Sequence, residues 1–322
     1  MRRLLGPVLI GVGVFLVVAG LLARFYAYPA LAVAPKDQNS VTMLEAKGAT
    51  ILDLATLREV TTDMSVANRT VGDVKASDEA DDGIVVWAAT TSYRDQIGNI
   101  RSRSAERYAF DAHSGEAVNC CGSFVEETDG ERLEVKRSGL ISKYPFGTEQ
   151  KDYKFWDDTL GQAVTTKFVK ESEIEGLTVY EFKYEVPLTT VGTREIPPSL
   201  VGQPGTDALE VDIQYSTITQ HWVEPTTGVV INRVSKTANT LALDGETLIT
   251  TSGGTFQYTD EQVKDNVDEY KGKASSLQAV HTTVPLVGLV LGLLLILGGV
   301  LLARRNRNEA PSSSDDTVSL TK

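Results

Sequence analysis

LLGPVLIGVGVFLVVAGLLA, residues 4–23, and VPLVGLVLGLLLILGGVLLA, residues 284–303, are the two stretches that decide the organisation of this chain. Neither contains a charged residue. A helix of this length rises about 30 Å, which matches the hydrocarbon thickness of a bilayer. The sequence therefore predicts two transmembrane helices, at residues 4–23 and 284–303, with a large segment between them.

Basic residues flank both apolar runs on the side of the chain termini. Arg2 and Arg3 precede the first run, and three arginines follow the second, at positions 304, 305 and 307. Because basic flanks stay in the cytoplasm, residues 1–3 and 304–322 are expected inside and residues 24–283 outside, in a two-pass cell-membrane protein. The first run has a second interpretation as a cleaved signal peptide, since residues 30–32 and 32–34 have the A-x-A pattern. Its length exceeds the roughly 7–15 apolar residues of a signal sequence, which favours the anchor.

The segment between the runs is strongly acidic. Six of the 31 basic residues and three of the 43 acidic residues lie in the terminal tails, so the formal charge of residues 24–283 is near −15. Such a surface repels phosphate backbones, which excludes nucleic acid as a partner. The bilayer is the one partner that the sequence defines, and it leaves the oligomeric state open.

The outer segment has the pattern of an antiparallel β domain. Residues 84–87 and 179–186 are rich in β-branched and aromatic residues, and Asp244-Gly245 stands between two apolar runs as a hairpin signal. At residues 259–283, Thr259 and Gln262 form a capping-box pattern before a helical apolar stripe, which predicts a helical stalk. The fold class is thus a mainly β outer domain, residues 24–283, with an α-helical stalk between two transmembrane helices. Residues 72–83 are expected to form an exposed loop, and residues 304–322 a disordered cytoplasmic tail.

Few residue patterns point to chemistry. Cys120 and Cys121 are adjacent and, in an oxidising compartment, predict a vicinal disulfide, with two reduced thiols as the alternative. The three histidines show no metal-ligand spacing, and no nucleophile elbow or phosphate-binding loop is present. No catalytic, cofactor-binding or metal-binding residue is therefore predicted. Gly288 and Gly292 form a G-x-x-x-G pattern, which favours close packing of the second span against another helix.

One segment resembles a known family. Residues 144–157 read YPFGTEQKDYKFWD, and this segment is similar to a signature of the actinobacterial porin PorA family. The residues that carry the resemblance are Tyr144, Pro145, Phe146, Gly147, Tyr153, Trp156 and Asp157. The resemblance implies two terminal spans and a large outer domain over nearly the whole chain. It brings no catalytic residues with it, and the segment itself is interpreted as a structural corner or a ligand site.

Three functions are compatible with these features. The first is a non-enzymatic cell-envelope protein whose outer domain binds or transfers a lipid, glycolipid or envelope partner, by analogy with the two-ended tether of class B scavenger receptors. The second is a porin-like channel component, as the family name suggests. Against a membrane barrel stand the acidity of the middle segment and its irregular strand pattern. The third is an envelope enzyme acting on a glycan through paired acids.

Overall fold

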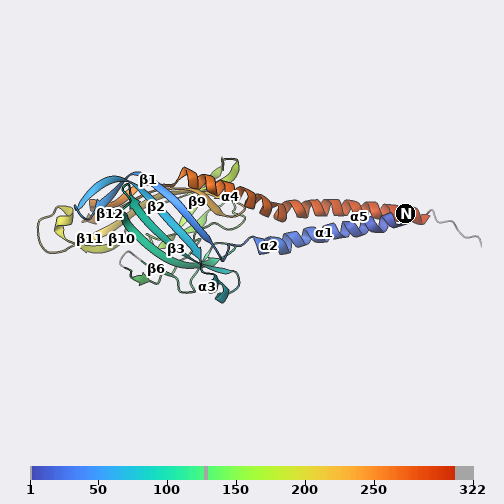
Figure 1. The fold of residues 1–322 in the computed structure, drawn as a ribbon, viewed down its shortest axis with the longest axis horizontal. Coiled ribbons are helices and arrows are strands. Elements are labelled where there is room, and N and C mark those ends of the chain that lie inside the picture. Colours follow the sequence, from blue (N-terminus) through green and yellow to red (C-terminus); the bar gives the residue numbers. More distant parts are fainter. Residues whose placement is uncertain (1, 127–129, 309–322) are drawn as a thin grey trace, which may run out of the picture. The chain divides into compact units, whose positions relative to one another are not determined.

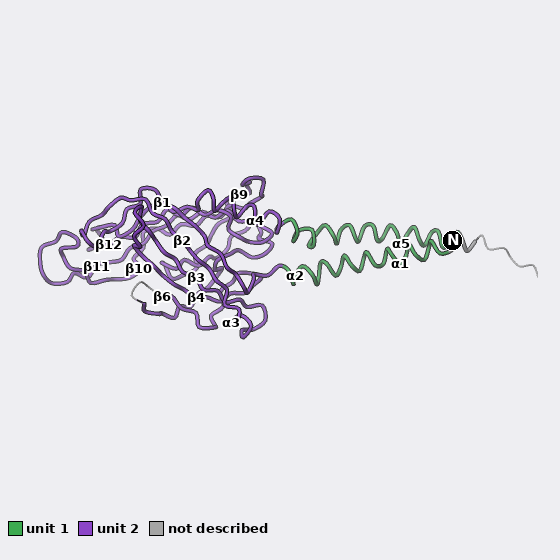
Figure 2. Tube along the Cα trace, viewed as in Figure 1, with its two compact units in different colours: residues 1–31, 275–322 green, residues 32–274 purple. Residues whose placement is uncertain are grey.

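The computed structural model describes residues 2–126 and 130–308. The chain divides into two compact units (Figure 2). One unit is helical and contains residues 1–31 and 275–322, and the other contains residues 32–274. Each unit is described separately below.

The helical unit consists of two helical segments, one from each end of the chain. The first contains α1 (Arg2–Leu22), a π-helical turn (Ala23–Ala27) and α2 (Tyr28–Leu31). The second follows α4 (Asp260–Gln278) through a π-helical turn (Ala279–Thr283) into α5 (Val284–Asn308). Both segments are long and apolar enough to cross a membrane. The helix α5 extends past residue 303 into the predicted tail, and the rest of that tail, residues 309–322, lies outside the described residues.

Glycines bring α1 and α5 into close contact. A Cβ atom on Gly292 would lie 2.6 Å from the Gly13 carbonyl oxygen, and one on Gly288 would lie 2.7 Å from the Leu16 carbonyl oxygen. On α1, Gly6 and Gly20 make similar approaches to α5 at seven-residue intervals on either side of Gly13. The absence of side chains at these positions lets the two backbones approach closely.

The second unit is built on one antiparallel sheet (Figure 1), which confirms the predicted fold class. Its strands are β1 (Asn39–Asp53), β2 (Arg58–Gly72), β3 (Ile84–Asp95), β4 (Ile100–Asp111), β5 (Ala117–Val118), β6 (Phe124–Glu126), β7 (Arg132–Leu133), β8 (Tyr153–Asp157), β9 (Gln162–Ile174), β10 (Leu177–Ile196), β11 (Leu209–Glu224), β12 (Val229–Leu243) and β13 (Glu246–Tyr258). Their order is β7-β6-β4-β3-β2-β1-β13-β12-β11-β10-β9-β8, with β5 beside β4. We call the end at which β1 begins and β13 ends the neck end, and the opposite end the tip.

The sheet curls until its two edges meet. Tyr93 on β3 and Phe256 on β13 are three strand positions apart, about 14 Å along a flat sheet, yet their ring centroids are only 6.2 Å apart. At the neck end, Leu140 forms bridges to Glu116, beside β5, and to Phe155 of β8. Trp156 of β8 packs in the same cluster as side chains of β3 and β4. The described strands therefore enclose an interior.

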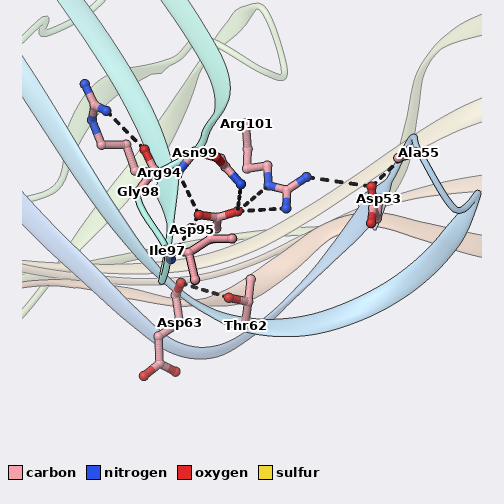
Figure 3. A network of polar contacts seen from close by, with 10 residues as sticks. All are labelled: Asp53, Ala55, Thr62, Asp63, Arg94, Asp95, Ile97, Gly98, Asn99 and Arg101. Carbon is pink, nitrogen blue, oxygen red and sulfur yellow. Dashed lines mark hydrogen bonds and ion pairs between the residues drawn. The ribbon is translucent and has the colours of Figure 1, made fainter.

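Charged side chains fix the turns at the tip. The β3–β4 turn is held by Asp95, whose carboxylate accepts hydrogen bonds from the backbone N–H groups of Ile97 and Asn99. Arg101 joins Asp95 at 2.7 Å and reaches Asp53, at the end of β1, at 3.7 Å (Figure 3). This bridge spans strands that are not neighbours in the sheet. The Asp244-Gly245 pair connects β12 to β13, and both residues have positive φ, of 52° and 84°.

Two local expectations need correction. The predicted exposed loop at residues 72–83 contains a short helix, α3 (Val74–Glu79), because Asp73 caps it by accepting a hydrogen bond from the Ala76 N–H. The strands are also longer and more regular than the sequence suggested, up to 20 residues in β10. Half of the predicted capping box at the start of α4 is present, because the Gln262 N–H donates to the Thr259 hydroxyl. The Gln262 side chain does not return to the Thr259 N–H, since its Oε1 accepts from the Met43 N–H instead.

The outer face of the sheet is not suited to lipid. Exposed charged residues alternate along the central strands with the residues of the inner face, and they include Glu59, Asp63 and Arg69 on β2, Lys183 on β10 and Lys236 on β12. A membrane barrel needs an uncharged outward band about 25 Å tall. This curled sheet therefore does not itself cross a bilayer.

A polar layer inside the sheet as candidate functional site

The strand register defines which side chains face the interior. Pairing places Arg233 of β12 opposite Tyr258 of β13 and His221 of β11. The same alternation directs Tyr93 of β3 and Tyr184 of β10 to the inner face. Midway between the neck end and the tip, this face carries mainly hydroxyl, amide and charged groups: Asn68, Thr91, Tyr93, Glu106, Tyr184, Tyr215, Thr217, Thr219, Arg233, Ser235 and Tyr258.

Arg233 is the central cation of this layer. Its Nε donates a hydrogen bond to the Ser235 hydroxyl at 3.0 Å. Four tyrosines surround it, namely Tyr93, Tyr184, Tyr215 and Tyr258, and their charge interactions raise the pKa of the guanidinium although burial opposes this. Among the described residues no carboxylate forms an ion pair with it.

Hydroxyl groups continue from Arg233 along the inner face. The Thr219 hydroxyl donates to Ser235 at 3.0 Å and contacts the Thr217 hydroxyl at 3.2 Å. Two tyrosine hydroxyls, of Tyr215 and Tyr184, donate to the same Asp157 oxygen, at 3.0 and 3.4 Å. These bonds hold the hydroxyl groups in a fixed arrangement, since each bond joins a donor to an acceptor.

A second charged group consists of Glu106 on β4, Arg137 in the loop between β7 and β8, and Asp158 directly after β8. Arg137, whose side chain is 2% exposed, donates to Glu106 at 2.8 Å and lies 3.6 Å from Asp158. Burial and the neighbouring Asp158 raise the pKa of Glu106 to about 7, while Arg137 opposes the shift. Burial also raises the pKa of Asp158, although its side chain is 61% exposed. The Asp158 side chain therefore contacts water, with Arg137 and the Trp156 Nε1 beside it.

The segment of residues 139–148 closes the neck end. The Tyr144 N–H donates to the Gly228 carbonyl at 2.8 Å, and the Gly147 N–H donates to the Thr226 carbonyl at 3.1 Å. The fully buried ring of Tyr144 stacks on Phe182 at 4.6 Å. Its hydroxyl contacts the Thr166 hydroxyl at 3.1 Å and His221 Nδ1 at 3.2 Å. Burial, followed by the charge of Arg233, lowers the pKa of His221 to about 3, so this imidazole is neutral.

Two similar loops hold this closing segment. In one, the Asp111 carboxylate accepts from the N–H groups of residues 113 and 114, and in the other Glu224 accepts from those of residues 226 and 227. Each loop then has a glycine with positive φ, Gly115 or Gly228. A Cβ atom would lie 2.8 Å from the Lys143 carbonyl oxygen at Gly115 and 2.1 Å from that of Tyr144 at Gly228. Both positions require glycine so that the closing segment can pass.

The sequence-predicted residues occupy two regions. From the signature segment, Tyr144 lies in the closing segment with Pro145, Phe146 and Gly147, Tyr153 packs against the Tyr144 ring, and Asp157 reaches the polar layer. Trp156 packs in the cluster with the β3 and β4 side chains, and its Nε1 donates to Asp158 at 2.7 Å. Cys120 and Cys121 are joined by a disulfide in the loop between β5 and β6.

Sequence reasoning missed most of the polar layer. Arg233, Glu106 and Asp158 lie on three elements far apart in the chain, and no spacing connects them. The sequence offers one signal for this site: Arg233 stands within the strand-like residues 229–234. A charged residue at an inward-facing position of such a strand indicates a polar interior, but the inward position is known only from the register.

The fold and site together define a class of protein: a membrane protein with one long apolar helical segment near each end of the chain and a curled antiparallel domain with a polar interior. The family model described as Porin PorA matches residues 5–301, and the chain belongs to that family. It is also similar to a Porin PorA of Corynebacterium amycolatum, with 24% identity over 294 residues that cover 72% of this chain and 76% of the relative. The family and the two apolar helices indicate a membrane protein of the cell envelope.

Proposed function

We propose that the protein has a porin-like role in handling small hydrophilic solutes, which occupy the polar layer inside the sheet. The observation that carries this proposal is the chemistry of the inner face. Arg233, four tyrosines and a row of hydroxyls face inward, and the Asp158 side chain, whose charge acts on Arg233, is 61% exposed. A polar lining of this kind replaces the hydration of a polar solute.

A lipid chain fits this interior less well. The apolar side chains form several clusters, among them one around Tyr144 and Phe182 at the neck end and one around Val211 and Leu241 at the tip. The rings of Tyr184 and Tyr215 pack with Val186 in another cluster, while their hydroxyls reach Asp157. The polar layer lies between the first two of these clusters in the strand register. An acyl chain crossing it would leave polar groups without partners, at a cost of about 1–3 kcal/mol for each. We therefore prefer a hydrophilic occupant to the lipid or glycolipid ligand that the sequence first suggested.

Membership in the Porin PorA family and the orientation of the chain support the same role. With both termini in the cytoplasm, as the basic flanks favour, residues 24–283 face the outside, where hydrophilic solutes arrive. Because the outer face of the sheet is charged, the domain that contains the proposed solute site is surrounded by water and not by lipid. An epitope tag in the exposed β10–β11 loop at residues 202–207 tests this orientation. External protease should remove that tag and leave a tag at the C-terminus intact.

The proposed function is tested with purified full-length protein in detergent. All three tryptophans, Trp87, Trp156 and Trp222, belong to the β unit, so their emission reports on that unit alone. The emission is titrated with a panel of neutral and charged sugars and with a single-chain lysophospholipid. The proposal predicts a saturable change with at least one hydrophilic solute. A saturable change with the lipid alone, and none with any hydrophilic solute, would contradict it.

A further inference from the structure

We propose that Arg233 is the anion-recognising residue of the interior, and that the solute carries an oxyanion, a phosphate or a carboxylate, on a hydroxylated body. This inference rests on the proposed function and specifies its substrate class. It is argued from the partners of one side chain and from the groups that face it.

The first step concerns the unpaired charge of Arg233. A guanidinium has five N–H donors, and the one hydrogen bond found from this side chain to a described residue is donated by Nε to Ser235. The four tyrosines lie near this side chain, and among the described residues it has no carboxylate partner. Taking a cation out of bulk water without a counter-ion is costly, so a site of this kind is stabilised by an incoming anion. The planar fork of the terminal nitrogens matches a phosphate or carboxylate.

The second step concerns why the protein's own acids do not fill this place. Asp157 is the acceptor for the Tyr184 and Tyr215 hydroxyls and for the Leu160 N–H. Asp158 accepts from Trp156 Nε1 and pairs with Arg137. Both carboxylates therefore accept hydrogen bonds from other side chains. Asp158 and Arg233 interact through their charges, but they form no ion pair. Among the residues that the structure describes, no acid therefore occupies the place of a ligand at the terminal nitrogens of Arg233.

The third step concerns the body of the ligand. The four tyrosines lie near Arg233, and the Ser235 hydroxyl accepts a hydrogen bond from it. From Ser235 the hydroxyls of Thr219 and Thr217 continue along the inner face. Hydroxyls both donate and accept hydrogen bonds, which suits a ligand with hydroxyls of its own. The acidic surface of the domain disfavours the approach of anions at long range, but this repulsion is screened beyond about 8 Å at physiological ionic strength.

The test compares an anionic sugar with its neutral parent. Equilibrium dialysis of full-length protein in detergent at 0.15 M salt measures binding of radiolabelled glucose 6-phosphate, glucose and inorganic phosphate. The protein variants are Arg233→Gln, Arg233→Lys and, as a matched control, Arg69→Gln, which removes an exposed arginine from the outer face of β2. We expect wild type to bind glucose 6-phosphate at least tenfold more tightly than glucose. The Arg233→Gln variant should lose at least tenfold in affinity for the phosphate ester, Arg233→Lys less, and Arg69→Gln nothing.

The outcomes separate this inference from the proposed function. Equal binding of glucose 6-phosphate and glucose by wild type, unchanged in Arg233→Gln, would overturn the role of Arg233 and leave the hydrophilic site in place. Binding of neither sugar nor phosphate would count against both. If Arg233→Gln fails to fold, as judged by tryptophan emission, the wild-type preference for the phosphate ester decides the question by itself.

Discussion

The closing segment at the neck end offers a sharp test of how the fold is held. Tyr144 is fully buried, and its hydroxyl contacts Thr166 and His221. Replacing it with Phe removes the hydroxyl and leaves two buried polar groups without this partner, which costs roughly 1–3 kcal/mol. Replacing it with Ala also removes the ring that packs on Phe182, and the cost rises to about 3–5 kcal/mol.

Urea unfolding of the full-length protein in detergent, followed by tryptophan emission, measures these costs. The matched control is Tyr153→Phe, because the Tyr153 hydroxyl accepts one solvent-exposed hydrogen bond from the Glu149 N–H. Its effect should stay below about 1 kcal/mol. If Tyr144→Phe destabilised the unit no more than Tyr153→Phe does, the buried bonds to Thr166 and His221 would not hold the segment, and our description of the neck end would be wrong.

Three further predictions concern other parts of the molecule. Burial lowers the pKa of Lys143 to about 7, so between pH 7 and 9 the unfolded chain binds more protons than the folded one. The free energy of unfolding should therefore rise with pH in wild type, by at most about 1.4 kcal/mol per pH unit, but not in Lys143→Met. Urea midpoints with the same pH dependence in both proteins would contradict this. Burial raises the pKa of Asp95, but hydrogen bonds from Asn99 and Arg101 outweigh burial and lower it. Asp95→Asn should therefore be less stable than wild type at pH 7, and the difference should shrink as the pH falls below the usual aspartate pKa of about 4. A difference that stays constant as the pH falls would refute this. Gly292→Leu should separate α1 from α5 and speed amide hydrogen exchange in both helices. Gly298→Leu is the control and should not do so, because a Cβ atom there meets nothing within 4 Å. Equal exchange rates in the two variants would show that the contact at Gly292 does not hold the helices together.

The parts of the fold that the sequence predicts are those set by local pattern. The two apolar runs, the Asp244-Gly245 turn and the Thr259 cap depend on residues close together in the chain, and each is present in the structure. The seven-residue spacing of Gly6, Gly13 and Gly20 on α1 is also a local pattern, and all three glycines contact α5.

The candidate site was not predictable because it depends on curvature. Whether β3 approaches β13 is decided by how far the sheet curls and by the bridges that Leu140 makes at the neck end. These are contacts between residues far apart in sequence, and strand propensity carries no information about them. In the sequence, Arg233 therefore cannot be distinguished from other strand residues. The strand register of the folded chain directs it to the inner face.

The occupant of the interior is observed most directly in a crystal structure of the full-length protein soaked with selenate. Our account predicts an anomalous selenium peak beside Arg233, with the selenate oxygens within hydrogen-bonding distance of its terminal nitrogens. An interior filled by an acyl chain, with no selenate peak and with Arg233 turned to the outer surface, would contradict it.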